Sequence, residues 1–390
     1  MIMKIAFIGN LPAASVLEPD FIRESHRGVS HPAPWIAGLL PALAKLSGFK
    51  LRVLLIQRAV LRHCIIERDG VEYEGIPYRF PGRINVRTFH LMHSIQARRA
   101  LQRFRPDVVH AFGMETGSAT IALRTGFPVS CFVQGISEYL YPYYSPRATG
   151  EVRIERWCEA QAVRRIKWFV AETEFGRNWV IKNNPSAKVS LIPHPLRSDF
   201  LDQAAPTYAR QVVAVGGLDG RKGTDTVIKA FALANVEGGK LCIVGSGPLE
   251  MSLKNLADSL NIRDRVEFTG GLDTQKVIQR LNESSVLVIG SRMDTSPNVV
   301  SEAHAIGLPV IGTLTGGIPE MIDEGKDGYL VGVDDVDAMS LRMRQLLADP
   351  DECRRMGMVG REKVKKLNCA DAVALAHLKF FQSIGRDLNR

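Results

Sequence analysis

Short apolar segments rich in β-branched residues alternate with helix-like segments along most of this 390-residue chain. Continuous apolar runs are typical of strands that are buried on both faces. Strands that alternate with helices form a parallel sheet with helices on both of its faces, so the pattern predicts an α/β fold. In the first half we expect strands at residues 4–8, 51–56, 108–111, 127–133, 167–172 and 189–192, and helices at 35–46 and 90–104.

The length favours two domains, each large enough to bury its own core. We expect the first domain over residues 1–196 and the second over residues 210–371. A linker is expected at 194–210, where Pro195 and Pro206 stand among polar residues. No apolar run approaches the roughly 18 residues of a membrane span. The first nine residues read as a strand and are too short for a signal peptide.

Two acidic residues, Asp294 and Glu302, flank the expected start of a helix in the second half. A buried strand precedes them, Ser296 can cap the helix, and Pro297 suits its first position. The helix continues over residues 298–306, which places Glu302 about two turns inside it. The helix N-terminus between the two acids has free N–H groups and a positive dipole end, so it suits a diphosphate. A surface acid followed by a helix-face acid is the alternative, and spacing alone does not separate the two.

Two glycine-rich turns follow apolar strands in the second half. Residues 217–223 place Lys222 in a turn that does not fit P-loop spacing, which argues against ATP hydrolysis by that route. Residues 245–250 have Glu250 where a dinucleotide fingerprint needs its third glycine, so an NAD site is disfavoured. What remains is a flexible positive charge suited to a diphosphate, and an ordinary surface lysine is the alternative.

Sequence blocks between residues 211 and 332 occur in the order and at the spacing of the retaining family 4 glycosyltransferases, and the chain resembles that family. The blocks are 213–224, 241–248, 266–270, 291–311, 316–320 and 327–331. The resemblance implies the GT-B fold, in which two Rossmann-like doubly wound domains face each other across a cleft. It also implies that the last helix, at about residues 372–390, packs back on the first domain. The first half of the chain matches only in outline.

The resemblance implies roles for individual residues of the second half. Asp294 would orient the donor sugar, Glu302 would hold the ribose, and Lys222 would stabilise the leaving diphosphate. Other residues of the matched blocks would line the donor site: Gly217, Arg221, Gly245, Gly247, Thr269, Ser296, Pro297, Asn298 and Val299. GT-B enzymes generally work without a metal ion, and the sequence has no conspicuous D-x-D pair. We therefore expect neither a metal nor a cofactor besides the sugar nucleotide.

The chain departs from the family pattern at three positions. Gly217 stands where the family usually has arginine, and Arg221, next to Lys222, is a candidate to compensate. Asp294 replaces the usual glutamate and loses one methylene of reach, which affects the choice of sugar. Gln134 stands where the family often has histidine. Glutamine can hydrogen-bond a hydroxyl but cannot carry a proton.

The acceptor is expected to contact the first domain, at loops that follow its strands. Candidate contacts are Gly9, Asn10, Glu115, Gln134 and Tyr139. Tyr139 belongs to a group of four tyrosines within six residues, and tyrosines stack on sugar rings or lie at membrane interfaces. An ordinary packed or mobile loop explains these tyrosines equally well.

The basic excess lies in the first half. Residues 1–200 carry 27 Lys and Arg against 16 Asp and Glu, whereas residues 201–390 carry 23 against 25. Basic residues at 98–105 and 164–167 lie next to apolar residues, which favours contact with an anionic membrane face or an anionic acceptor. A solvated helix face is the alternative. Nucleic acid is disfavoured because no binding motif accompanies the charge.

The six cysteines show no C-x-x-C spacing, so we expect reduced, buried thiols and no structural zinc. Taken together, these features predict a cytoplasmic retaining glycosyltransferase, peripheral on the inner membrane face. It would move a hexose-type sugar from a nucleotide diphosphate donor to a glycan or lipid-linked acceptor. Two alternatives stay open: a non-catalytic sugar-nucleotide-binding protein, because Gly217 and Asp294 weaken the usual catalytic set, and a GT-B sugar-nucleotide epimerase.

Overall fold

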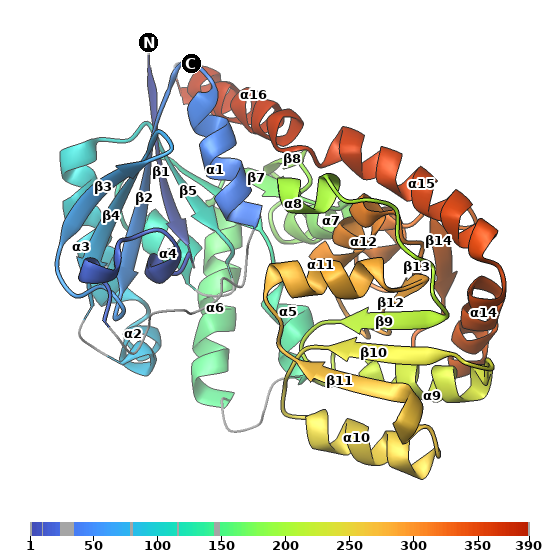
Figure 1. The fold of residues 1–390 in the computed structure, drawn as a ribbon. Helices are drawn as coiled ribbons and strands as arrows, with labels where there is room; N and C mark the ends of the chain where they lie inside the picture. The colour runs from blue at the N-terminus through green and yellow to red at the C-terminus, as the bar shows by residue number, and fades with distance from the viewer. Residues whose placement is uncertain are drawn as a thin grey trace. The chain divides into compact units, whose positions relative to one another are not determined.

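The computed structural model describes residues 2–9, 11–23, 35–78, 81–114, 117–143 and 149–388. The chain divides into two compact units: unit 1 comprises residues 1–195 and 370–390, and unit 2 comprises residues 196–369. Each unit is an α/β domain built on one mostly parallel sheet (Figure 1). The predicted fold class is confirmed. Within the described residues, no helix combines the length and apolar character needed to span a membrane.

The sheet of unit 1 has eight strands in the order β3-β4-β2-β1-β5-β6-β7-β8. Neighbouring strands are parallel except at one edge, where β3 runs antiparallel to β4. The strands are β1 (Met3–Gly9), β2 (Phe49–Gln57), β3 (Cys64–Arg68), β4 (Val71–Pro77), β5 (Val108–Phe112), β6 (Val129–Val133), β7 (Trp168–Ala171) and β8 (Lys188–Leu191).

The edge strand β3 corrects the expectation of a wholly parallel sheet. β3 and β4 are joined by Asp69 and Gly70, whose φ angles are +53° and +75°. Two residues with positive φ between paired strands form a tight hairpin turn, and Asp-Gly is a preferred sequence for it. Residues 64–77 therefore fold back on themselves, in a region where no strands were assigned from the sequence.

Helices cover both faces of the unit 1 sheet. On one face α1 and α16 enclose an apolar core in which Phe381 of α16 lies edge-on to Phe7 of β1, with ring centroids 6.2 Å apart. On the other face α3, α4 and α6 contribute to a core that includes Val109 of β5 and Cys131 of β6. The C-terminal helix is thus part of unit 1. The helices are α1 (Trp35–Lys45), α2 (Gly82–Arg87), α3 (Leu91–Phe104), α4 (Ser118–Leu123), α5 (Ser137–Leu140), α6 (Thr149–Arg165), α7 (Glu174–Asn183) and α16 (Ala370–Leu388).

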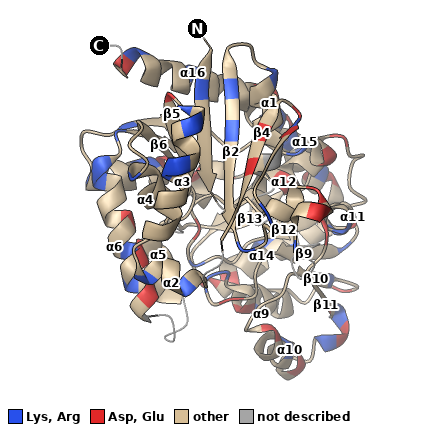
Figure 2. Cartoon of the chain, turned by 90° about the vertical axis from the view of Figure 1, so that its left-hand side faces the viewer, with Lys and Arg blue, Asp and Glu red and all other residues tan. Residues whose placement is uncertain are grey.

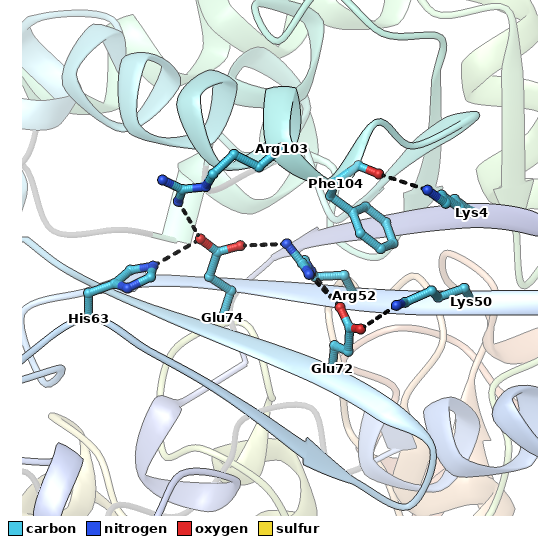
Figure 3. A network of polar contacts seen from close by, with 8 residues as sticks. All are labelled: Lys4, Lys50, Arg52, His63, Glu72, Glu74, Arg103 and Phe104. Atoms are coloured by element: carbon cyan, nitrogen blue, oxygen red, sulfur yellow. Dashed lines mark hydrogen bonds and ion pairs between the residues drawn. The ribbon is translucent and has the colours of Figure 1, made fainter.

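A network of charged residues lies between α3 and strands β2 and β4 (Figure 3). Glu74 of β4 is fully buried and accepts hydrogen bonds from Arg52 at 3.1 Å and Arg103 at 2.9 Å. Arg52 also donates to Glu72 at 2.5 Å and lies over the ring of Phe104. Because each buried charge has a hydrogen-bonded partner of opposite sign, the fold tolerates them in its interior.

The sheet of unit 2 has six parallel strands in the order β11-β10-β9-β12-β13-β14. The chain adds strands on one side of β9 up to β11 and then on its other side from β12, so the strand order reverses between β9 and β12. In open α/β sheets of this order, ligands bind outside the carboxyl ends of the strands at the reversal. The strands are β9 (Gln211–Val215), β10 (Lys240–Val244), β11 (Val266–Gly270), β12 (Val286–Val288), β13 (Val310–Thr313) and β14 (Gly328–Val331). The helices are α8 (Ser198–Leu201), α9 (Thr224–Ala234), α10 (Glu250–Ser259), α11 (Thr274–Asn282), α12 (Asn298–Ile306), α13 (Ile318–Met321), α14 (Val336–Ala348) and α15 (Pro350–Leu367).

Residues 196–210 belong to unit 2 and are not a free linker. Leu196, Phe200 and Tyr208 are buried in its core, and the Tyr208 hydroxyl donates to the carbonyl of Gly307 at 3.0 Å. The prolines and polar residues of this segment suggested a linker, but its three apolar side chains are spaced to reach the core. All six cysteines of the chain are unpaired, and five of them are buried.

Candidate functional site

The loops that follow β9 and β12 meet where the strand order of unit 2 reverses. Arg221 and Lys222 come from the β9 loop, and Asp294 comes from the β12 loop. The two loops are joined by a backbone hydrogen bond from Arg292 to Arg221 at 2.7 Å. Lys222 also lines a small pocket together with Gly216 of its own loop. The fold therefore brings together three residues that were predicted from two separate motifs.

Asp294 is a buried carboxylate held by two cations. Its Oδ2 lies 2.7 Å from Lys222 Nζ and 3.1 Å from Arg221 Nη1, and only 8% of the residue is exposed. Burial raises the pKa of Asp294, but the charges and hydrogen bonds of Lys222 and Arg221 outweigh burial and hold this pKa below its usual value. The adjacent side chains of Arg221 and Lys222 thus converge on one anion.

Two residues that the sequence analysis did not single out shape the β9 loop. Asp219 Oδ1 accepts hydrogen bonds from the backbone N–H groups of Arg221 at 2.9 Å and Lys222 at 3.2 Å. Arg292 donates to the carbonyl of Gly220 at 2.8 Å and pairs with Asp225 at 2.8 Å. Arg292 also pairs with Asp334 at 2.8 Å. Its partners are far from it in sequence, so no local pattern signalled this role.

Gly245 and Gly247, predicted to bind the donor, have a packing role. A Cβ at Gly245 would lie 1.9 Å from the carbonyl oxygen of Gly216, and a Cβ at Gly247 would lie 2.5 Å from that of Leu218. The loops after β9 and β10 approach so closely that only glycine fits at both positions. Packing alone accounts for these two glycines, and donor contact by them stays a prediction.

The start of α12 differs from the prediction by one residue. Pro297 occupies the N-cap position with no capping side chain, and the helix begins at Asn298. Ser296 does not cap, because the extended backbone of Pro297 places it one residue too early; its Oγ lies 3.7 Å from Met321 Sδ. Glu302 lies four residues after Asn298, about one turn inside the helix and not two. An N-terminus without a side-chain cap keeps its first N–H groups, those of Asn298 and Val299, for another acceptor.

The loop after β13 holds the backbone of Asp294 in place. Gly317 N donates to the carbonyl of Asp294 at 3.0 Å. Gly316 has a φ of +56°, and a Cβ there would lie 1.8 Å from the same carbonyl oxygen. Only glycine allows this approach, so the Gly316-Gly317 pair has a physical role in positioning the carboxylate.

The remaining predicted residues are placed as follows. Thr269 lies in β11, and its hydroxyl donates to the carbonyl of Gly270 at 2.9 Å. In unit 1, Gly9 ends β1, Gln134 follows β6 and is partly exposed, and Tyr139 packs against Phe175 with ring centroids 5.2 Å apart. Gly217 is exposed in the β9 loop. Asn10 and Glu115 lie outside the described residues. No group of three or more His, Cys, Asp or Glu side chains suited to a metal occurs in the part of the chain that the structure describes.

Two protein-family models match the chain in succession. The glycosyl transferase 4-like domain matches residues 32–195, and glycosyl transferases group 1 matches residues 199–363. N-acetyl-alpha-D-glucosaminyl L-malate synthase of Bacillus anthracis is 35% identical over 167 residues, which are 43% of this chain and 43% of that protein. GDP-mannose-dependent alpha-(1-6)-phosphatidylinositol monomannoside mannosyltransferase of Mycobacterium tuberculosis is 33% identical over 200 residues, 46% of this chain and 52% of that protein. The match thus spans about half the length of these relatives.

Among solved structures, sucrose-phosphate synthase from Thermosynechococcus elongatus has the same fold. It superposes with a TM-score of 0.81 over 99% of this chain and 100% of that chain, at 20% identity. The two family models together extend over both units, and the fold agrees with them. The chain therefore belongs to the group 1 glycosyltransferases and has their GT-B fold.

Proposed function

We propose that this protein transfers a hexose-type sugar from a nucleotide diphosphate donor to a glycan or lipid-linked acceptor, with retention of the anomeric configuration. The observation that carries the proposal is the convergence of Lys222 and Arg221 on Asp294 at the strand reversal of unit 2. Membership of the group 1 glycosyltransferases supports a sugar nucleotide as the ligand of this site. Retention rests on the resemblance to family 4.

Asp294 occupies the place of an anion between the two cations. A diphosphate carries more negative charge than one carboxylate, and arginine and lysine both bind phosphate oxygens well. The donor diphosphate would therefore take Lys222 and Arg221 from Asp294. Once released, the Asp294 carboxylate accepts hydrogen bonds from hydroxyls of the donor sugar. Donor binding and sugar orientation are coupled in this way.

Bond cleavage leaves a nucleoside diphosphate whose growing charge needs stabilisation. Lys222, Arg221 and the N–H groups of Asn298 and Val299 supply it, because preorganised donors stabilise charge that develops in the transition state. Glu302, one turn inside α12, holds the ribose hydroxyls. By resemblance to the family, the acceptor hydroxyl attacks the sugar on the same face from which the leaving group departs, and a phosphate oxygen of the donor takes the proton of that hydroxyl.

An exposed patch on unit 1 supports an acceptor at an anionic membrane surface. Five large apolar residues on or beside α2, α3 and α6 are between 38% and 52% exposed, and the rings of Phe89 and Trp157 pack edge-on with centroids 5.3 Å apart. They are Ile84, Phe89, Leu91, Ile95 and Trp157. Figure 2 shows Lys and Arg on α2, α3 and α6. Aromatic and aliphatic side chains beside arginines suit the headgroup region of a bilayer.

The names of the two relatives indicate different acceptors. One is named as a synthase of N-acetyl-alpha-D-glucosaminyl L-malate, and the other as a mannosyltransferase of phosphatidylinositol monomannoside. The apolar patch favours the lipid-linked class for this protein. We propose accordingly that it works at the cytoplasmic face of a membrane, where sugar nucleotides are available. Binding to vesicles of phosphatidylglycerol that is lost in Trp157→Glu would agree with this; equal binding of both proteins would contradict it.

The proposed transferase activity is tested by donor binding, slow donor hydrolysis and transfer. A thermal-shift screen of nucleoside diphosphates and sugar nucleotides identifies the donor, because a ligand that binds the folded state raises its melting temperature. With that donor, Lys222→Ala and Glu302→Ala should each lower transfer about 100-fold or more without lowering thermal stability much. Lys276→Ala is the matched control, since Lys276 is 64% exposed on α11.

Each alternative function has its own outcome in the same assays. Tight donor binding with no turnover over a panel of acceptors would indicate a non-catalytic binding protein. Conversion of the donor to a sugar epimer without any acceptor would indicate an epimerase. Near wild-type transfer by both Lys222→Ala and Glu302→Ala would show that the donor site is placed wrongly.

A further inference from the structure

Arg292, in the loop after β12, binds three segments that are far from it in the sequence. Its Nη1 donates to the carbonyl of Gly220 at 2.8 Å, and its Nη2 donates to Asp225 Oδ2 at 2.8 Å. Nε donates to Asp334 Oδ2 at 3.0 Å and Nη2 lies 2.8 Å from Oδ1 of the same residue, so this ion pair is bidentate. One planar side chain thus connects the loop after β9, the first turn of α9 and the loop after β14.

The backbone of Arg292 adds two hydrogen bonds in the same region. Its N–H donates to the carbonyl of Arg221 at 2.7 Å, and its carbonyl accepts from Thr315 Oγ1 at 3.1 Å. Residues 219–222 carry both cations of the site, and we call them the cation turn. Arg292 therefore binds two successive carbonyls of the cation turn, one through its side chain and one through its backbone.

A second contact holds the cation turn in the protein without ligand. Lys222 and Arg221 pair with Asp294 at 2.7 and 3.1 Å. The hydrogen bonds that Asp219 accepts from these two residues lie within the turn, so they set its shape and do not connect it to another loop. Arg292 and the Asp294 carboxylate thus both connect the turn to the loop after β12.

The charges around Arg292 are balanced. Asp225 also lies 3.7 Å from Lys229, so two cations face two carboxylates. Burial raises the pKa of Asp225, but the hydrogen bond and charge of Arg292 outweigh burial and lower it. Hydrogen bonds from Arg292 are the largest cause of the lowered pKa of Asp334. Both carboxylates are therefore ionised at neutral pH, and this cluster adds no net positive charge to the diphosphate site.

Donor binding as proposed above changes which of these contacts remain. A diphosphate that takes Lys222 and Arg221 from Asp294 leaves the turn without its ion pairs to the loop after β12. Arg292 is already paired with two carboxylates, so an incoming anion gains little by competing for it. Its bonds to the turn then fix where the two cations lie relative to the first N–H groups of α12, which would bind the same diphosphate.

We propose that Arg292 is a positioning residue of the donor site, which keeps the cation turn in place after the diphosphate has displaced Asp294. The inference rests on the transferase function proposed above. Arg292 acts through the two cations of the turn and not through contact with the donor. The planar fork of arginine is needed, because the single ammonium group of a lysine cannot bind the Gly220 carbonyl and both carboxylates in the same geometry.

Hydrogen exchange tests the position of the turn independently of affinity. Under saturating inorganic pyrophosphate, the amides of residues 219–222 should exchange at least about fivefold faster in Arg292→Met than in wild type. Arg280→Met is the matched control, because Arg280 also pairs with two carboxylates, Glu267 at 2.5 Å and Glu283 at 3.4 Å. Glu267 is the second residue of β11, so this cluster lies at the amino ends of the strands, away from the site. Equal exchange in wild type and Arg292→Met would overturn the inference.

Calorimetric titration with inorganic pyrophosphate tests the effect on binding. Arg292→Met should bind about tenfold more weakly than wild type, and Arg280→Met should bind like wild type. Arg292→Lys keeps the positive charge but should recover no more than about twofold of the lost affinity, because the geometry of the fork is missing. Wild-type affinity in either Arg292 variant would overturn the inference, and so would the absence of any pyrophosphate binding by the wild type.

Kinetics separate this inference from the proposed function. With the identified donor, Arg292→Met should lower kcat about 100-fold, because a displacement of about 1 Å at the reacting groups has an effect of this size. The KM for the acceptor should stay within about twofold of wild type, since Arg292 acts on the donor. A kcat like that of Arg280→Met would refute the inference and leave the transferase intact. If the wild type transfers no sugar, the transferase proposal fails, and the exchange and titration experiments still decide whether Arg292 positions the turn.

Discussion

Glu74 in unit 1 and Asp294 in unit 2 are both buried carboxylates, and each is held by two cations. Glu74 accepts from Arg52 and Arg103 at 3.1 and 2.9 Å. Asp294 accepts from Lys222 and Arg221 at 2.7 and 3.1 Å. Measured by burial and ion pairing alone, the two groups are nearly equivalent. Ion pairing alone therefore does not identify a functional carboxylate.

Their positions in the fold separate them. Glu74 lies within β4, and its partners are Arg52 of the neighbouring strand β2, Arg103 of α3 and His63, whose Nε2 lies 3.0 Å from Oε1 (Figure 3). Arg52 also binds Glu72, so the two carboxylates of β4 share one guanidinium group. Asp294 lies in a loop beyond the carboxyl end of β12, next to an uncapped helix start. An ion pair inside a sheet supports the fold, whereas one at the strand ends can be exchanged for a ligand.

The largest expected effect is a difference between the two units in their stability at acid pH. Burial lowers the pKa of His377 in unit 1 and of His304 in unit 2 to about 4. Burial also lowers the pKa of His93 to about 4 and that of His110 well below its usual value, and both lie in unit 1. Unfolded histidines bind protons below about pH 6.5, whereas these do not, so stability falls as pH is lowered from 6.5 toward 4. A shift like that of His377 corresponds to about 3 kcal/mol.

Hydrogen exchange measured from pH 7 to pH 4.5 checks this expectation. Unit 1, with three such histidines, should lose protection before unit 2, with one. The pKa of Asp294 is lowered, so its contribution to stability is lost only at pH values below about 3.8 and adds nothing in this window. Earlier loss of protection in unit 2 would contradict the prediction that buried neutral histidines make unit 1 the less acid-stable unit.

The second prediction concerns the removal of the negative charge of Asp294 in unit 2. Asp294→Asn removes the anion that competes for Lys222 and Arg221, so inorganic pyrophosphate should bind about tenfold more tightly. Transfer should fall about 100-fold, because the amide no longer accepts hydrogen bonds from the sugar in the same way. Calorimetry and transfer rates measure the two changes. Weaker pyrophosphate binding in this variant would show that Asp294 does not compete with the ligand.

The third prediction concerns the removal of the negative charge of Glu74 in unit 1. Glu74→Gln keeps the shape of the side chain but leaves Arg103 and Arg52 with one anionic partner fewer, so unfolding should become easier by about 2–3 kcal/mol. Denaturant unfolding gives this value, and pyrophosphate binding by unit 2 should not change. A variant as stable as wild type would mean that the Glu74 network does not hold unit 1 together.

The smallest expected effect comes from adding a positive charge to the loop that carries Arg221 and Lys222. Gly217 has no positive φ, and a Cβ there would meet only Asp219 Oδ2 at 3.6 Å, an ordinary contact. Gly217→Arg, the residue that the family usually has there, should therefore fold and bind pyrophosphate up to about tenfold more tightly. Gly220→Arg is the matched control, because its Cβ meets nothing within 4 Å. Equal gains in both variants would indicate a general charge effect.

Much of unit 2 was predictable because its signals are local. Strand, loop and helix patterns around Lys222 and Asp294 placed both residues beyond the carboxyl ends of strands, and the order of the blocks indicated the family. Asp69-Gly70 was an equally local signal for the β3-β4 hairpin and was missed. The start of α12 was wrong by one residue, since Ser296 and Pro297 both suit a helix start and only the backbone conformation separates them.

The chain's sequence alone determined the alternation of strands and helices, the family and the charged residues of the loops after β9 and β12, because these signals depend on neighbours along the chain. Only the tertiary structure decided that Arg221 and Lys222 converge on Asp294, and that Glu155, His90, Asn85 and His93 form one chain of hydrogen bonds. Hydrogen bonds between residues 65 or 72 positions apart leave no periodic pattern in a sequence. They form when packing brings distant segments within about 3 Å, and the free energy of that packing is distributed over the whole core.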